Sequence, residues 1–146
     1  MKARLFHNEH PNVSTIADGI AFVKSTVDMI LSSPVYKDNT LILLTWDEGG
    51  GFFDHVRPPA SPPINVDVDD HGNAVPYGTR VPFLVVGSFA KKGAISHVAM
   101  EHSSIVKFLE YNFLTQVGQL NARDSWVNNI GSLLDASRTG IRIPDR

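Results

Sequence analysis

The stretch Thr40-Leu41-Ile42-Leu43-Leu44-Thr45-Trp46, followed by Asp47-Glu48-Gly49-Gly50-Gly51, decides the fold class of this 146-residue chain. Its apolar residues lack the polar alternation of a half-exposed strand, which is typical of a strand covered on both faces in a parallel sheet. A second such run, Val81-Pro82-Phe83-Leu84-Val85-Val86-Gly87, predicts a second strand, since a strand tolerates proline at its start.

Helical patterns flank these two strands. An apolar stripe with spacings of three and four predicts a helix over 16–31, formed by Ile16, Ile20, Val23, Val27, Ile30 and Leu31. Ser14 or Thr15 is expected to cap it and Pro34 to stop it. Two more helices are expected, from Ser103 or Ser104 to Phe113 and roughly over 124–134.

This order of elements indicates an α/β layer fold with a mostly parallel sheet and flanking helices, in one domain over residues 1–146. Two or three strands make a small sheet, so we expect part of the sheet to be absent from the chain. The irregular stretch 57–80 between the strands is long for a compact domain, and such loops are often functional.

Composition excludes several function classes. The net charge is −2, from 13 basic and 15 acidic side chains, and Lys91-Lys92 is the longest basic run, which argues against nucleic-acid binding. The absence of cysteine excludes a disulfide framework, a thiolate nucleophile and a Cys-based zinc site. No apolar run approaches the ~20 residues of a transmembrane helix, and no signal peptide is visible.

Four ionisable side chains gather around the glycine run. Asp47 and Glu48 stand at the carboxyl end of the first predicted strand, where α/β sheets bind ligands. Adjacent carboxylates repel each other, and a bound cation is one reason to place them together. Asp54 and His55 follow on the far side of the turn. A solvated turn or a helix cap explains the same residues, so the residues alone leave both readings open.

The string Thr45-Trp46-Asp47-Glu48-Gly49-Gly50-Gly51-Phe52-Phe53-Asp54-His55-Val56 resembles the signature of a bacterial phosphoesterase family, which includes non-haemolytic phospholipases C and acid phosphatases. The resemblance continues in order through most of the chain. It includes Glu9-His10-Pro11, Tyr77-Gly78-Thr79-Arg80-Val81-Pro82-Phe83, Gly93-Ala94-Ile95-Ser96-His97, Glu101-His102-Ser103-Ser104-Ile105 and Arg123-Asp124.

The resemblance implies a hydrolase of phosphate esters with a fold related to the alkaline phosphatase superfamily. Asp47 and Glu48 would be ligands of a divalent metal ion, whose identity stays open. His55 would be a catalytic residue that contacts the phosphate or supports a ligand. The substrate would be a phospholipid or a small phosphoester, and the family resemblance suggests a periplasmic or secreted protein.

The chain departs from the family pattern in one respect. Relatives carry an early Glu-Asn metal-binding pair and a Ser or Thr nucleophile, whereas this chain has no Glu-Asn pair and no assignable nucleophile. We therefore expect a truncated member whose nucleophile is not in this chain and whose partner is the missing amino-terminal half. The alternative is a non-catalytic remnant, or a metal-binding module that needs a partner chain for activity.

Four other places carry two readings each. Arg80 could clamp a phosphate, but a structural ion pair is the commoner role. Glu101-His102-Ser103-Ser104 favours a helix cap over a catalytic group. His10 is expected on a plain surface loop rather than near the site. Residues 67–78 imitate a calcium loop, yet Gly78 stands where the bidentate Glu is needed.

Overall fold

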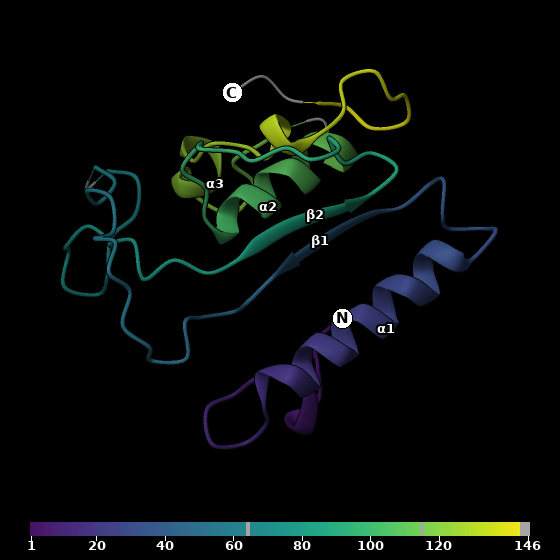
Figure 1. Ribbon diagram of the computed structural model, residues 1–146. Coiled ribbons are helices and arrows are strands. Elements are labelled where there is room, and N and C mark those ends of the chain that lie inside the picture. The colour runs from purple at the N-terminus through teal and green to yellow at the C-terminus, as the bar shows by residue number, and fades with distance from the viewer. Residues whose placement is uncertain (64, 115, 144–146) are drawn as a thin grey trace. The chain divides into compact units, whose positions relative to one another are not determined.

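The computed structural model describes residues 1–63, 65–114 and 116–143 (Figure 1). Its internal contacts divide the chain into two compact units. The first consists of Met1–Phe53 and Val81–Ser88, and the second of Asp54–Arg80 and Phe89–Arg146. Each unit is described by itself below.

The first unit contains one long helix, α1 (Ile16–Ser32), preceded by the short 3-10 helix η1 (Leu5–His7). Thr15 caps α1: its hydroxyl accepts a hydrogen bond from the Asp18 N–H at 3.1 Å, and Asp18 Oδ2 accepts one from the Thr15 N–H at 3.2 Å. This capping box satisfies two N–H groups at the helix start. Ser33 ends the helix and Pro34 follows, so the predicted helix is confirmed.

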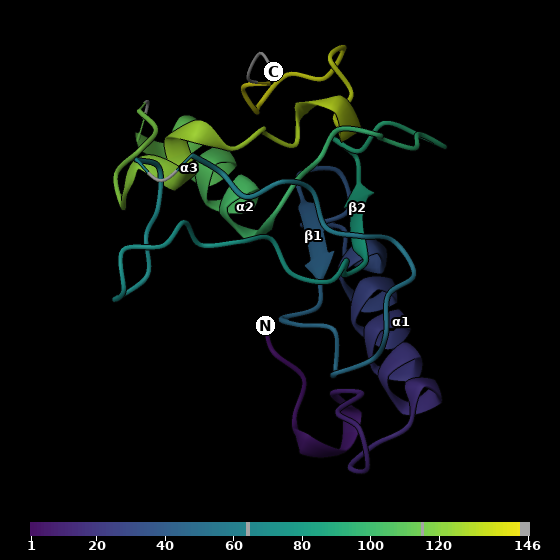
Figure 2. The ribbon, with the colours of Figure 1, turned by 90° about the vertical axis from the view of Figure 1, so that its left-hand side faces the viewer.

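Two strands, β1 (Leu41–Thr45) and β2 (Phe83–Gly87), pair in the first unit, and both lie inside the predicted runs (Figure 2). They run antiparallel, with Leu41 opposite Gly87 and Thr45 opposite Phe83. A mixed α/β fold is thus confirmed, but the expected parallel direction is wrong for this pair. An apolar run reports how a strand is covered, not which way its neighbour runs, and the long connection between these strands permits either direction.

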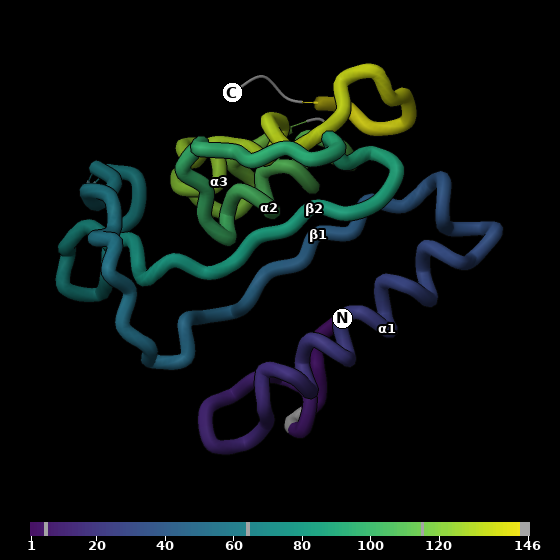
Figure 3. Tube along the Cα trace, in the orientation of Figure 1, coloured from purple at the N-terminus to yellow at the C-terminus, as the bar shows by residue number. Residues whose placement is uncertain are grey.

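The described residues of the second unit include the irregular segment 54–80 and form four short helical elements: α2 (His102–Leu109), the π-helical turn η2 (Glu110–Leu114), α3 (Ala122–Trp126) and the 3-10 helix η3 (Gly131–Leu133). The helix predicted up to Phe113 corresponds to α2 and η2. The single helix predicted over 124–134 is wrong: α3 ends at Trp126, and the short η3 begins only at Gly131. Figure 3 traces the chain through 54–80 before it returns as β2.

The buried apolar side chains of the described residues all belong to the second unit: Val66, Phe89, Phe108, Val127, Ile130 and Leu134. Full burial of such a side chain contributes about 1.5–3 kcal/mol relative to leaving it in water. The backbones beside two of these residues also pair: Ala90 and Leu134 form an isolated antiparallel bridge, and the Asp135 N–H donates to the Phe89 carbonyl at 2.9 Å. The core of this unit therefore joins the segment after β2 to the carboxy-terminal elements.

Among the described residues, no helix has both the length and the apolar character needed to cross a bilayer.

Candidate metal-binding site

The site begins where β1 ends. Thr45 is the last residue of the strand, and its hydroxyl donates to the Pro82 carbonyl at 2.9 Å. This bond ties the end of β1 to the chain that leads into β2. Trp46 follows and is half-buried, and Asp47 and Glu48 come next with exposed side chains. The strand-end position predicted for the two carboxylates is confirmed.

Asp47 is held against a positive charge. Its Oδ2 lies 2.9 Å from Lys2 Nζ, and both side chains are largely exposed. The hydrogen bond from Lys2, with the Asp47 backbone N–H and the Lys2 charge, lowers the pKa of Asp47 below its usual value. The carboxylate is therefore ionised at neutral pH and already binds a cationic group.

Glu48 turns back on its own loop. Its Oε2 accepts a hydrogen bond from the Gly50 N–H at 2.6 Å. Gly50 and Gly51 have φ values of +67° and +74°, a left-handed conformation that glycine adopts without steric cost. The glycine run is thus needed for the turn that holds the Glu48 carboxylate at the strand end.

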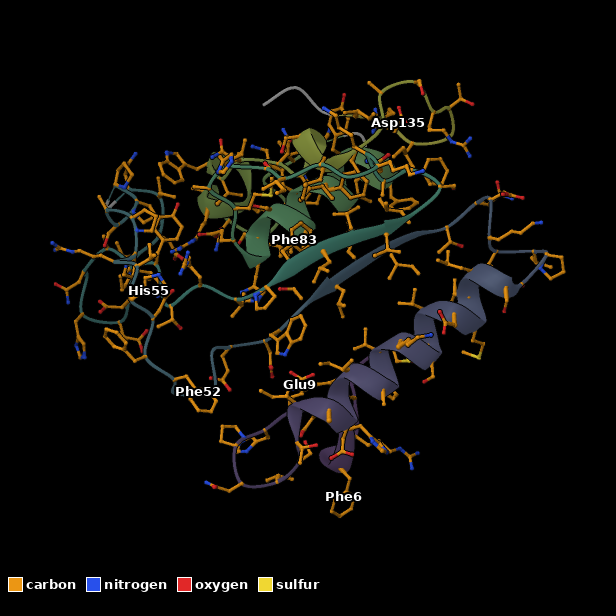
Figure 4. All side chains as sticks on the ribbon, in the orientation of Figure 1. Phe6, Glu9, Phe52, His55, Phe83 and Asp135 are labelled. Carbon is orange, nitrogen blue, oxygen red and sulfur yellow. The ribbon has the colours of Figure 1, made fainter. Side chains whose placement is uncertain are left out.

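Glu9 reaches the same place from the loop before α1. Its Oε2 accepts a hydrogen bond from Trp46 Nε1 at 2.8 Å, across 37 residues of sequence. Figure 4 shows Glu9 beside the first turns of α1. His10, the next residue, is exposed, and its Nδ1 lies 2.9 Å from the Pro11 carbonyl, in agreement with a surface loop.

Asp54 and His55 belong to the second unit. Asp54 is engaged by Arg80, whose Nε and Nη2 donate to its two oxygens at 2.9 and 2.8 Å. The hydrogen bonds from the Arg80 side chain and from the Val56 and Arg80 backbones hold the pKa of Asp54 well below its usual range. His55 is exposed. The ion-pair reading of Arg80 is confirmed, and Asp54 is occupied as its partner.

The carboxylates of Asp47 and Glu48 are the right type of ligand for a hard cation, but they are too few to hold one. Carboxylate oxygens are the ligands that magnesium, calcium and manganese prefer. Within residues 1–63, 65–114 and 116–143, however, no group of three or more His, Cys, Asp or Glu side chains is arranged to hold a metal ion. Asp47 and Glu48 would therefore supply two ligands, and further ligands would have to come from elsewhere.

Glu101 has a structural partner in the second unit. It precedes α2, and its backbone N–H donates to the Ser104 hydroxyl at 3.1 Å, so a role at the helix start is confirmed. Its carboxylate accepts two hydrogen bonds of 2.8 Å from Arg123. Arg123 also donates to the Val75 carbonyl at 3.0 Å and lies over the Tyr77 ring. This guanidinium thereby ties segment 54–80 to α2 and α3.

The calcium-like stretch is a closed turn. Asp69 Oδ1 accepts from the backbone N–H groups of His71 and Asn73, at 2.9 and 2.8 Å. Asp67 lies 3.4 Å from Arg123. The side chains that would have served a cation are thus used by the turn and by an ion pair, as the solvated-loop reading predicts.

Local sequence patterns did not reveal three of these partners. Lys2 stands 45 residues before Asp47, Glu9 stands 37 residues before Trp46, and Arg123 stands 22 residues after Glu101. No periodicity or motif connects such distant positions. The one available signal was the family resemblance, which included Glu9-His10-Pro11 and Arg123-Asp124 without giving them a partner.

Comparison with known proteins supplies a family. A family model described as "Phosphoesterase family" matches residues 1–116. The non-hemolytic phospholipase C of Pseudomonas aeruginosa is 31% identical over 127 residues, which cover 73% of this chain and 18% of that protein. Phospholipase C B of Mycobacterium tuberculosis is 31% identical over 139 residues, which cover 86% of this chain and 26% of the relative.

A plant protein is similar to the same extent. The non-specific phospholipase C6 of Arabidopsis thaliana is 32% identical over 137 residues, which cover 82% of this chain and 25% of the relative. The matched region thus spans 18% to 26% of the length of these three relatives. With most of its length inside the family match, the chain belongs to the Phosphoesterase family.

Proposed function

We propose that this chain is the metal-holding portion of a phosphate-ester hydrolase of the phospholipase C or acid phosphatase kind. Family membership and the names of the relatives support the reaction class. The observation that carries the site is the ionised Asp47 at the end of β1, with a cationic group 2.9 Å from its carboxylate. A nearby positive charge favours the ionised form of the carboxylate, which is the form that binds a cation.

Asp47 and Glu48 would hold a divalent cation, and their exposed side chains leave room for it. Such an ion polarises phosphoryl oxygens and lowers the pKa of an attacking hydroxyl. Glu48 keeps one oxygen on the Gly50 N–H and would present the other to the ion. His55, exposed at the base of segment 54–80, is proposed to contact the phosphate of a phospholipid or a small phosphoester.

The alternative is a metal-binding module that needs a partner chain for activity. One observation favours it: the part of the chain that the structure describes places no third ligand beside Asp47 and Glu48. Under this reading, the nucleophile and the remaining ligands come from an amino-terminal half carried by another polypeptide.

The experiment measures hydrolysis of p-nitrophenyl phosphate and p-nitrophenyl phosphorylcholine with added manganese, calcium or zinc. We expect no turnover by the isolated chain and restored turnover after mixing with an amino-terminal half. Asp47→Ala should abolish the restored activity. Asp28→Ala is the matched control, because Asp28 is another exposed aspartate of the first unit paired with a lysine, Lys24.

Two results would contradict the proposal. Metal-dependent turnover by the chain alone would show that the nucleophile lies within it. If mixing does not restore activity and Asp47→Ala leaves metal binding unchanged, the proposed hydrolase site is contradicted.

A further inference from the structure

We infer that Glu9 is a positioning residue for the proposed metal ligands and acts through Trp46; the inference rests on the proposed function. Trp46 is the residue that joins the end of β1 to Asp47 and Glu48. Whatever fixes its indole also limits the directions in which the next two side chains can point.

The indole N–H of Trp46 is bound by Glu9. Tryptophan has one N–H donor, and in Trp46 it donates to Glu9 Oε2 at 2.8 Å. On the other side, the Thr45 hydroxyl holds the strand end to the Pro82 carbonyl at 2.9 Å. The backbone between Thr45 and Asp47 is therefore held at two points: Thr45 is bonded to Pro82, just before β2, and Trp46 is bonded to Glu9, in the loop before α1.

The position of the Glu9 side chain depends on α1. Glu9 has a φ of +60°, which is uncommon for a residue with a side chain. Its side chain packs on Gly19, where an added Cβ would lie 2.1 Å from Glu9 Oε1 and 2.2 Å from its Cγ. Glycine weakens a helix interior relative to alanine. Gly19 nevertheless occupies this buried position because only glycine leaves space for the Glu9 carboxylate.

Three variants separate positioning from the other roles that Glu9 could have. Glu9→Gln keeps an oxygen acceptor for Trp46 but removes the charge, whereas Glu9→Ala removes both. Gly19→Ala leaves Glu9 unchanged but forces its carboxylate away from the indole, while improving the helix propensity of α1. A purely structural role predicts that metal affinity follows stability, and Gly19→Ala separates the two.

The probe is Tb³⁺, a hard cation whose emission is excited through a neighbouring tryptophan. The chain has two tryptophans, so all variants are made in a Trp126→Phe background, in which Trp46 is the remaining tryptophan, and the ion is excited at a wavelength that tryptophan absorbs and tyrosine does not. Glu9→Ala and Gly19→Ala are expected to weaken Tb³⁺ binding about tenfold, the lower end for loss of a residue that orients metal ligands. Glu9→Gln should stay near the parent protein.

A readout without metal accompanies the titration. The Trp46 emission should shift to longer wavelength in Glu9→Ala and Gly19→Ala, because the released indole meets water, but not in Glu9→Gln. Thermal unfolding should show Gly19→Ala at least as stable as its parent while its Tb³⁺ affinity falls.

The outcomes are distinguishable. If Asp47→Asn leaves Tb³⁺ binding unchanged, the proposed metal site fails and the inference falls with it. If Asp47→Asn abolishes binding but Glu9→Ala and Gly19→Ala do not weaken it, the inference alone is overturned. If Glu9→Gln weakens binding as much as Glu9→Ala, the charge matters rather than the hydrogen bond, and Glu9 is a ligand instead of a positioning residue.

Discussion

Arg80 donates three hydrogen bonds to the carboxylate of Asp54: from Nε at 2.9 Å, from Nη2 at 2.8 Å and from its backbone N–H at 3.0 Å. These two residues stand at the first and last positions of segment 54–80 in the second unit. A bidentate guanidinium–carboxylate pair is the strongest form of such a contact. The long segment is therefore closed at its base.

Breaking the Asp54–Arg80 ion pair, called the clamp below, should make segment 54–80 more mobile. In Asp54→Asn the fork of Arg80 loses its charged acceptor, and we expect faster cleavage within 54–80 in limited proteolysis, with the rest of the chain unaffected. Asp70→Asn, an exposed aspartate of the same segment, is the control. Equal cleavage rates in both variants would show that the clamp does not order the segment.

The same clamp should respond to acid. Because its hydrogen bonds lower the pKa of Asp54 in the folded chain, its stabilising effect is complete above the unfolded aspartate pKa of about 3.9. The effect is lost as the pH falls through the lower, folded value. Proteolysis of 54–80 by an acid-active protease should therefore accelerate below about pH 4 in the parent, and this acceleration should be absent in Asp54→Asn.

Removing Arg123 should be more damaging. The side chains of Arg123 and Glu101 are only 10% and 13% exposed, so Arg123→Met leaves a buried carboxylate without its partner. Breaking such a pair typically costs about 3–5 kcal/mol. Urea denaturation should show this loss, and Arg123→Lys should not restore it, because lysine lacks the bidentate fork.

A matched arginine serves as the control for that experiment. Arg138 lies over the Phe89 ring at 5.8 Å, a contact worth about 0.5–1 kcal/mol where it is exposed. Arg138→Met should lower the free energy of unfolding by no more than that. Similar losses in the two variants would mean that Arg123 contributes only its ring contact.

Asp124 should link the stability of the second unit to pH. It is 2% exposed, and its oxygens accept from the Leu120 and Asn121 N–H groups, both at 3.1 Å. Burial opposes its charge, but these bonds and one from Glu110 outweigh burial and lower its pKa. Its contribution is therefore present above the unfolded pKa of about 3.9 and lost as the pH falls further.

Asp124→Asn tests this link. The variant leaves a buried N–H without its charged acceptor, which costs about 1–3 kcal/mol at neutral pH. Denaturation between pH 6 and pH 3 should show a shallower acid dependence in the variant than in the parent. An unchanged slope would place the acid sensitivity on other carboxylates.

Local signals predicted the elements well. The stripe of α1 and the Thr15 cap depend on residues within one or two helical turns, so the sequence pattern contained all the information needed. The strand runs were equally local. The direction of pairing was not, because it depends on how the chain between Thr45 and Phe83 returns, and no residue pattern encodes that path.

In the candidate site, too, local features were predictable from the sequence and long-range contacts were not. The place of Asp47 and Glu48 at the end of β1 followed from the apolar run before them. The Lys2 and Glu9 contacts required the fold, since each crosses more than thirty residues of sequence. Their chemistry was visible in advance only as unassigned charges near the amino terminus.

Lys2 should compete with a metal ion for Asp47. The Lys2 ammonium occupies the Oδ2 side of the carboxylate, so an ion that takes this oxygen must displace it. Lys2→Ala should tighten Tb³⁺ or Mn²⁺ binding by up to about fivefold, the most that an exposed pair usually contributes. Thermal stability should hardly change. Calorimetric titration checks this, with Lys37→Ala as an exposed-lysine control; weaker binding in Lys2→Ala would contradict the competition.

The glycine run offers a matched pair of variants. Gly50 and Gly51 both have positive φ values, and placing a side chain there costs about 1–2 kcal/mol. Gly51→Ala meets no other atom within 4 Å, whereas a Cβ at Gly50 would lie 3.1 Å from the Phe52 ring. The Gly50 N–H also holds Glu48. We therefore expect similar losses of stability from both changes but weaker Tb³⁺ binding only in Gly50→Ala. Equal binding in the two variants would show that the turn does not orient Glu48.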